Sequence, residues 1–339
     1  MNRKDFLSAV VPLATFTSAF TNQTSSAKTH GLKKIPPYLK KGSTIGICCP
    51  SGYISLEECQ PAIKKMQEWG FNIRVGITVG LKDFTFAGTD EERAKDLQEM
   101  MDDRSINAIM LGRGGYGAVR IIDKIDFTEF EKRPKWIIGF SDATVFHCHI
   151  NHNYGIATLH SKMCNSFPDD FSKADQTQID SIESIRQCLF GEKMIYKRVP
   201  VIENRSGEGI GPLVGGNLSI IEQVNGSISD LHTEGKILFI EDVGEYRYKI
   251  DGMLWNLKRS KKLDRLKGLI VGEFRIKPDD AGEEFGKTIY EMVMEKVGEY
   301  HYPVCFDFPV GHVKENYALK CGVKHKLTVS KNETILKEI

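Results

Sequence analysis

Short apolar runs alternate with longer segments of helical periodicity through the first half of the chain. Strands are predicted at residues 43–50, 71–76, 106–112 and 135–140. Helices, with apolar positions three and four residues apart, are predicted at residues 55–70, 89–103, 118–125 and 142–155. Strands that alternate with helices are typical of βαβ units, so the pattern predicts an α/β fold with a parallel, doubly wound sheet.

The pattern changes after Met163. Residues 165–206 are mostly polar, with one helical stretch, and we interpret them as a linker. From Gly207 onward, glycine separates short apolar strands, and one further helix is predicted at residues 248–260. We therefore expect an N-terminal domain at residues 43–164 and a smaller, mixed α/β C-terminal domain at residues 207–328.

The N-terminus has a different composition from the rest of the chain. A short basic start is followed by an apolar run from Phe6 to Phe20 and then by small polar residues. This order is typical of a cleavable export signal, here at residues 1–27, and predicts a periplasmic or otherwise exported protein. The run is too short for a membrane-spanning helix, so no stable membrane insertion is expected. The alternative is an amphipathic or disordered tail on a cytoplasmic protein.

The charges and the cysteines exclude several kinds of partner. The 339 residues carry 46 Lys and Arg against 45 Asp and Glu, and the formal net charge of +1 argues against a nucleic-acid partner. None of the eight cysteines has a metal-site spacing, and several lie in apolar segments, so we expect buried free thiols. Free thiols favour a reducing compartment, whereas the export signal predicts an oxidising one. We take the export signal as the stronger indication.

Ser141 follows the predicted strand at residues 135–140 and begins a predicted helix. Ligand sites in open parallel sheets gather at the carboxyl ends of the strands, and a helix N-terminus favours negative charge. Ser141 can therefore be a nucleophile, with the backbone N–H of Asp142 facing an oxyanion. Serine is also a preferred helix N-cap, and Ala143 breaks the G-x-S-x-G pattern. At this point both interpretations stay open.

Another predicted strand ends in the glycine-rich stretch LGRGGYGAVR at residues 111–120. Successive backbone N–H groups around Gly114 and Gly115 can form an anion-binding nest, and a plain glycine turn is the alternative. The spacing does not match G-x-G-x-x-G, and no G-K-[ST] follows, so no nucleotide cofactor is expected.

A serine nucleophile needs a base and a group that orients the base. His312 follows an apolar segment and a glycine, which is typical of a loop at the edge of a domain. The strand predicted around residues 236–243 carries two acids near its end, Glu241 and Asp242. A third acid, Glu245, follows just beyond it. Three histidines crowd the helix at residues 142–155, but only His149 and His152 share a face, so no metal site is expected there.

Six motifs occur in order along the chain: FAGTDEERAKDLQEMMDD, GRGGYGAVRIID, GFSDAT, GPLVGGNLSII, FIEDVGEYRYKIDGML and FPVGH. Together they resemble the LD-carboxypeptidase family of serine peptidases, also called muramoyltetrapeptide carboxypeptidases, from about Ser43 to Thr328. The resemblance implies a flavodoxin-like N-terminal domain, a site between the two domains, a homodimer, and no metal or other cofactor.

The resemblance also assigns roles to individual residues. It implies a catalytic triad of Ser141, Glu241 and His312 that releases D-alanine from a murein tetrapeptide through an acyl-enzyme. The implied oxyanion donors are the backbone N–H of Asp142 and the Gly114–Gly115 turn. The expected substrate-binding residues are Arg113, Tyr116, Asn217 and His160.

Two departures from the family pattern bear on the choice of substrate. The chain reads HSKM at residues 160–163 where many relatives read roughly H-G-P-M, and Gly252 follows Asp251 where an arginine is usual. Two other functions stay open. One is a self-immunity amidase of the same family that cleaves peptide–nucleotide antibiotics. The other is a non-catalytic periplasmic protein that binds a small ligand and needs no Ser-Glu-His set.

Overall fold

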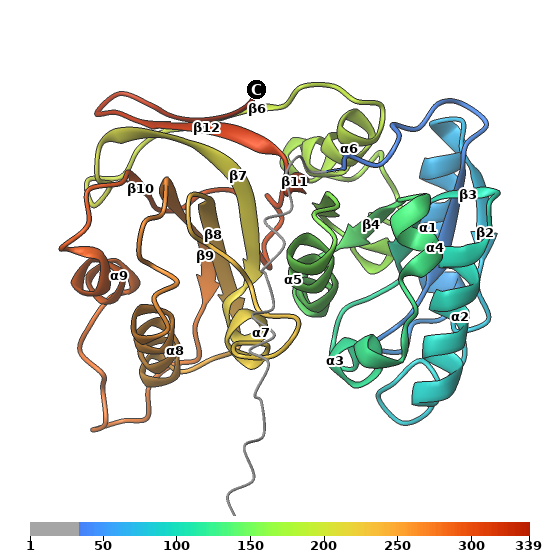
Figure 1. Ribbon diagram of the computed structural model, residues 1–339, viewed down its shortest axis with the longest axis horizontal. Coiled ribbons are helices and arrows are strands. Elements are labelled where there is room, and N and C mark those ends of the chain that lie inside the picture. Colours follow the sequence, from blue (N-terminus) through green and yellow to red (C-terminus); the bar gives the residue numbers. More distant parts are fainter. Residues whose placement is uncertain (1–33) are drawn as a thin grey trace, which may run out of the picture. The chain divides into compact units, whose positions relative to one another are not determined.

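The computed structural model describes residues 34–339, and the export signal predicted at residues 1–27 lies outside this range. Two β-sheets with flanking helices make up the described chain (Figure 1). The first sheet has six strands in the order β11-β5-β4-β3-β1-β2, and the second has seven in the order β10-β9-β8-β7-β12-β13-β6. The predicted α/β class with two domains is confirmed.

Five strands of the first sheet are parallel, and the sixth pairs antiparallel with β5. The strands are β1 (Thr44–Cys48), β2 (Asn72–Val75), β3 (Ile106–Leu111), β4 (Trp136–Gly139), β5 (Thr158–His160) and β11 (Leu319–Cys321). The parallel strands follow the order 2-1-3-4-5, which is the flavodoxin-like order that we expected. In such a sheet the carboxyl end of β4 is a natural position for a site.

Helices connect these strands, and two of them begin at strong sequence signals. They are α1 (Leu56–Glu68), α2 (Asp90–Asp102), α3 (Ala118–Ile121), α4 (Thr128–Lys132) and α5 (Thr144–Asn153). Ser55 with Glu58 and Thr89 with Glu92 form capping boxes. In each box, both side chains accept a hydrogen bond from the backbone N–H of the other residue. These caps fix where α1 and α2 begin.

The second sheet is parallel on one side and antiparallel on the other. Its parallel strands are β7 (Gly207–Asn217), β8 (Ile237–Val243), β9 (Gly268–Arg275) and β10 (Val304–Cys305). Its antiparallel strands are β12 (Lys324–Val329), β13 (Thr334–Glu338) and β6 (Ile195–Arg198). The helices of this part are α7 (Leu218–Gln223), α8 (Arg247–Arg259) and α9 (Ile289–Val297).

The structure changes two of the predicted domain boundaries. Residues 165–206 are not a plain linker, because they contain α6 (Gln176–Leu189), with buried Ile182 and Ile185, and the edge strand β6. The C-terminal sheet also extends past residue 328, because β13 inserts between β12 and β6. Strands β6 and β13 were missed because short strands near a sheet edge keep polar residues on one face, and the apolar pattern is then too weak to detect.

Helix α5 lies between the two sheets, which belong to one compact unit of the described chain (Figure 1). Gly216 of β7 approaches α5 so closely that a Cβ atom there would lie 2.4 Å from Thr144 Oγ1. The backbone N–H of Asn217 donates to the same hydroxyl oxygen, at 3.1 Å. This contact brings the end of β7, beside β8, next to the end of β4.

The prediction about the cysteines can be compared with the structure. All eight cysteine side chains are buried, as predicted. Within residues 34–339, no helix has the length and apolar character needed to cross a membrane.

Candidate active site

Ser141 has a strained backbone at the carboxyl end of β4. Its φ angle is +60°, in the left-handed region, which costs a residue with a Cβ atom about 1–2 kcal/mol. Ser141 is the first residue of a short 3₁₀ turn that precedes α5, and its side chain does not cap a helix; Phe140 and Ala143 occupy the two cap positions. The N-cap interpretation is therefore wrong. Backbone strain of this kind is concentrated at functional sites.

The glycine-rich loop after β3 lies directly against Ser141. A Cβ atom on Gly114 would lie 3.1 Å from the Cβ atom of Ser141 and 3.2 Å from its Oγ atom. The carbonyl oxygen of Gly114 accepts from the N–H of Gly52, at 3.0 Å. Because a trans peptide directs its C=O and the next N–H in opposite directions, the N–H of Gly115 points away from Gly52. Glycine at position 114 thus allows backbone donors to approach the serine.

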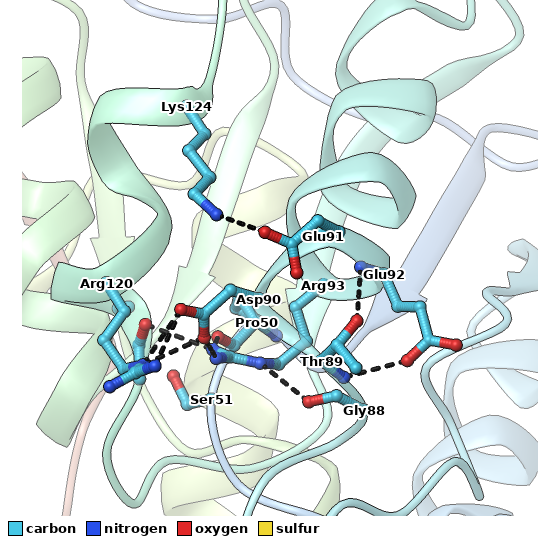
Figure 2. A network of polar contacts seen from close by, with 12 residues as sticks. Pro50, Ser51, Gly88, Thr89, Asp90, Glu91, Glu92, Arg93, Arg120 and Lys124 are labelled. Atoms are coloured by element: carbon cyan, nitrogen blue, oxygen red, sulfur yellow. Dashed lines mark hydrogen bonds and ion pairs between the residues drawn. The ribbon is translucent and has the colours of Figure 1, made fainter.

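A buried arginine holds this loop in place (Figure 2). The guanidinium of Arg93, on α2, donates from Nη1 to the carbonyl oxygens of Pro50, at 2.5 Å, and Gly117, at 3.1 Å. Its Nε donates to Gly88 O at 3.2 Å, and it forms an ion pair with Asp90. Arg93 thus links the loop after β1 to the glycine-rich loop. The sequence analysis did not identify this residue, although its position in the TDEER motif was the available signal.

The side chain of Asp142 is fully buried and has a structural role. Its Oδ2 atom accepts from Ser51 Oγ, at 2.5 Å, and from the backbone N–H of Ala118, at 2.8 Å. Burial raises the pKa of the Asp142 carboxyl, and the hydrogen bond from Ser51 opposes the rise. The side chain therefore ties two loops together below Ser141. The backbone N–H of Asp142, next to the serine, is the group predicted to bind an oxyanion.

His312 is paired with a buried carboxylate. Its Nδ1 atom lies 2.7 Å from Oε2 of Glu241, whose side chain has no solvent exposure, whereas 18% of the His312 side chain is exposed. Glu241 belongs to β8, and His312 lies in the loop between β10 and β11. This loop runs beside β9, where the N–H of Glu273 donates to the carbonyl oxygen of Val310 at 3.0 Å. A Cβ atom on Gly311, where φ is +132°, would lie 3.1 Å from Glu241 Cβ, so a glycine is needed for this approach. A proton on Nδ1 would leave Nε2 as the acceptor.

The structure brings the three predicted triad residues to the same region. The ring of Phe140, the residue before Ser141, packs against the imidazole of His312 with 4.8 Å between ring centroids. The loop that carries His312 is held by the side-chain oxygen of Asn316, which accepts from the N–H of Gly311 at 3.1 Å. Asn316 is a second positioning residue that the sequence analysis missed, since its spacing to His312 carries no recognisable signal.

The prediction that His160 binds substrate is wrong. Its side chain is completely buried at the end of β5, with its ring near Phe140 and Phe239, at centroid distances of 5.9 and 5.0 Å. Burial, and then the nearby rings of His147 and His312, hold its pKa far below the ordinary value, so it is neutral. The sequence analysis did not predict β5, so His160 was expected to contact the substrate rather than to lie inside a sheet.

The other predicted substrate-binding residues divide into two groups. Arg113 and Tyr116 are exposed on the glycine-rich loop, where Arg113 Nη1 donates to Tyr53 O at 3.3 Å and Tyr116 packs against Phe86. They are available to a ligand near Ser141. Asn217 is 5% exposed, and its Oδ1 atom caps α7 by accepting from the N–H of Ile220 at 3.2 Å. Capping explains Asn217 without a ligand.

One of the two remaining acids and two of the three histidines of α5 have structural partners. Asp242, beside Glu241, accepts from the N–H and the hydroxyl of Ser219, at 2.8 and 2.7 Å. Burial raises the pKa of Asp242 to about 6. His147 hydrogen-bonds Thr158 Oγ1 and Gly139 O, and His149 pairs with Ser229 Oγ. In residues 34–339, no three His, Cys, Asp or Glu side chains are grouped so that they could hold a metal ion.

Known proteins share this arrangement of domains. The profile of the LD-carboxypeptidase N-terminal domain matches residues 45–161, and that of the LD-carboxypeptidase C-terminal domain matches residues 210–327. Together these matches cover well over half of the 339 residues. The chain belongs to the LD-carboxypeptidase family. The membership makes it a serine-type carboxypeptidase, a hydrolase.

Individual relatives agree with this assignment. A probable murein peptide carboxypeptidase of Bacillus subtilis is 29% identical over 89% of this chain and 93% of its own length. The microcin C7 self-immunity protein of Escherichia coli is 26% identical over 88% of this chain and 93% of its own length. The crystal structure of muramoyltetrapeptide carboxypeptidase from Oxalobacter formigenes superposes with a TM-score of 0.77 at 26% identity, covering 87% of this chain and 98% of that one.

Proposed function

We propose that this protein releases the terminal D-alanine of murein tetrapeptides, with Ser141 as nucleophile, His312 as general base and acid, and Glu241 as the group that orients His312. The observation that carries the proposal is the hydrogen bond between His312 and the buried Glu241, next to a serine in a strained conformation. The names of the Bacillus and Oxalobacter relatives support the choice of a murein peptide as substrate.

In the proposed acylation step, Nε2 of His312 takes the proton of the Ser141 hydroxyl as Oγ attacks the scissile carbonyl carbon. The negative charge passes to the carbonyl oxygen, which accepts from the backbone N–H groups of Asp142 and Gly115. The buried carboxylate of Glu241 stabilises the imidazolium that forms. His312 then gives its proton to the leaving amine, the C–N bond breaks, and D-alanine leaves.

Deacylation repeats the same proton transfers with water. His312 takes a proton from a water molecule that attacks the ester carbonyl, and it returns the proton to Ser141 Oγ as the acyl group leaves. Glu241 keeps its charge throughout. Every step uses side chains and backbone groups of this chain, so the proposed reaction balances without a metal or a redox cofactor.

We also propose that the protein acts after export, because a murein peptidase with an export signal meets its substrate outside the cytoplasm. The homodimer that the family resemblance implies stays a prediction. Light scattering of the purified protein at several concentrations measures the oligomeric state directly.

A substrate comparison tests the proposed function. The purified protein is incubated with a murein tetrapeptide and, separately, with an aminoacyl sulfamoyl adenosine of the kind bound by the microcin relative. D-alanine release from the tetrapeptide, absent in Ser141→Ala, is the expected result. Cleavage of the nucleotide compound alone would favour the self-immunity amidase, and binding of the tetrapeptide without turnover would favour a ligand-binding protein.

A further inference from the structure

A cavity opens beside the exposed edge of His312. Its volume is about 640 Å³, enough for an amino acid residue, and its lining includes Lys162, Gln178, Arg275 and Val313 together with His312. The cavity is polar: three cationic side chains, Lys162, Arg275 and Lys314, line it together with one acid, Asp169. Lys162 follows β5 of the first sheet, and Arg275 ends β9 of the second sheet.

Lys162 is a buried cation with spare hydrogen-bonding capacity. Lys162 is only 7% exposed. Among residues 34–339, its ammonium has one hydrogen-bond acceptor, the carbonyl oxygen of Val313 at 2.9 Å. An ammonium carries three donors, so two remain for a ligand. Burial lowers the pKa of Lys162 to about 8, while the nearby carboxylate of Asp175 opposes the shift. The side chain is therefore still largely protonated at neutral pH.

The charges around Lys162 favour an anionic ligand. Arg275 is exposed, and its Nη1 atom lies 3.4 Å from the carbonyl oxygen of His312, the neighbour of the carbonyl that Lys162 contacts. Asp175 is itself paired with Lys314, at 2.8 Å, so its charge is already shared. Burying a cation is costly unless an anion or several acceptors compensate it, and the cavity has room for such an anion.

The chemistry of His312 indicates which part of the substrate enters this cavity. A histidine that protonates the leaving amine must lie beside the leaving residue, and the leaving residue of a carboxypeptidase carries a free α-carboxylate. We propose that Lys162, assisted by Arg275, binds the free α-carboxylate of the leaving amino acid and so makes the enzyme specific for the chain end. This inference rests on the proposed function and names the residues that select its substrate.

A neutral substrate analogue tests the assignment. We compare a murein tetrapeptide ending in D-alanine with the same peptide ending in D-alaninamide, which keeps the scissile bond and removes the charge. Wild-type kcat/KM should be about 10- to 100-fold higher for the acid, as expected for a charge-assisted hydrogen bond. In Lys162→Met, which keeps the length of the side chain, this acid-to-amide ratio should fall to within a few-fold of 1.

The ratio separates recognition from general damage. Lys162 also contacts the His312 loop, so Lys162→Met can lower turnover of both substrates, but such a loss cancels in the ratio. Arg275→Gln, at an exposed position that threatens the fold less, should lower the ratio partly. Lys162→Arg, which retains the charge, should keep most of it. Lys173→Met is the matched control, since it removes an exposed lysine outside the cavity lining, and should leave the ratio unchanged.

The possible outcomes distinguish this inference from the proposed function. A wild-type enzyme that cleaves the acid and the amide equally well would overturn the inference and leave the proposed function standing. The same holds if Lys162→Met and Arg275→Gln both keep the wild-type ratio. A wild-type protein that releases neither D-alanine nor D-alaninamide would overturn the proposed function, and the inference with it.

Discussion

The Nδ1 atom of His312 lies 2.7 Å from Oε2 of Glu241, a carboxylate that is completely buried. The other carboxylate oxygen, Oε1, has no hydrogen-bond partner within residues 34–339. A buried carboxylate without other partners is costly, and a positive charge on the imidazole would offset that cost. The pair is therefore arranged to stabilise the cation that His312 forms when it takes a proton.

The charge of Glu241 can be removed with little change in shape. We expect Glu241→Gln to lower kcat by roughly 10²- to 10⁴-fold, because the amide cannot stabilise the imidazolium and can favour the wrong histidine tautomer. The fold should be retained, which circular dichroism and thermal unfolding can check. Steady-state kinetics on the tetrapeptide measures the loss.

The two neighbouring acids are matched controls for Glu241. Asp242→Asn and Glu245→Gln each remove one negative charge close to Glu241 in the sequence, but Asp242 has its own partner in Ser219. Both variants should reduce kcat far less than Glu241→Gln. A larger loss of kcat in Asp242→Asn than in Glu241→Gln would contradict the assignment of Glu241 to the triad.

Asp242 should make stability depend on pH. Burial raises its folded-state pKa to about 6, and the charge of Glu241 adds to the rise, while hydrogen bonds from Ser219 and the N–H of Val243 oppose it. The folded protein therefore binds this proton more tightly than the unfolded chain between about pH 4 and 6. The stabilising contribution is complete below about pH 4 and is lost as the pH rises through 6.

The matching variant isolates this effect. Asp242→Asn has no proton to lose at this position, so the difference in unfolding free energy, wild type minus variant, should fall as the pH rises from 4 to 7. A change of about two pKa units corresponds to at most about 3 kcal/mol. Urea unfolding of both proteins at several pH values measures the difference, and a constant difference would mean that the carboxyl is not protonated in this range.

The sequence was sufficient where apolar periodicity is strong. Strands β1 to β4 and helices α1, α2, α5 and α8 lie within one or two residues of their predicted ranges. All of them except the edge strand β2, whose residues are mostly exposed, bury apolar side chains. Strand β5 has only three residues, and it was not predicted. That omission led directly to the error at His160, which the missing strand carries into the core.

The site could be predicted only in part for a different reason. Ser141, Glu241 and His312 are far apart in the chain and lie on two sheets, so periodicity cannot bring them together, and the family resemblance was needed. The roles of Arg93 and Asn316 depend on which carbonyl and N–H groups the folded loops present. The local sequence likewise does not predict the left-handed backbone of Ser141, because serine is also a preferred residue at ordinary helix N-caps.

The proposed export can be tested on the native protein. We expect Edman sequencing or mass spectrometry of the protein purified from its host to find a chain that begins after about Ala27, in an extracytoplasmic fraction, because signal peptidase removes such segments. An intact Met1 in the cytosolic fraction would contradict export. It would also agree with the eight buried cysteines, which do not require an oxidising compartment.

Arg93 and Arg120 bind the same carboxylate of Asp90 (Figure 2). The two arginine side chains differ in burial. The Arg93 side chain has no exposure, and Arg93→Met would leave the carbonyl oxygens of Pro50 and Gly117 without this donor. We expect this variant to lose about 2–4 kcal/mol of stability and to lower kcat, because both loops surround Ser141. Arg120→Gln, at an exposed position, should cost much less stability than Arg93→Met. Equal losses in urea unfolding would refute the positioning role of Arg93.

Ser141 offers a test in which activity and stability move in opposite directions. Ser141→Ala and Ser141→Gly both remove the hydroxyl, so each should lower turnover by a factor on the order of 10⁴ or more. Because φ at this position is +60°, glycine also relieves backbone strain, and Ser141→Gly should be more stable than Ser141→Ala by about 1 kcal/mol. Thermal unfolding and D-alanine release, measured on the same preparations, give the two quantities. A helix-capping serine would behave in the opposite way, with activity retained and stability reduced.

The coupling between Ser141 and His312 completes the test of the triad. His312→Ala should match Ser141→Ala in severity, since the hydroxyl is a weak nucleophile without its base. The double variant should be little worse than either single variant, because residues that act as one unit lose their contribution together. Losses in kcat/KM that multiply would mean that Ser141 and His312 act independently. The proposed mechanism would then fail even if the protein released D-alanine, and the hydrogen bond between His312 and Glu241 would need another explanation.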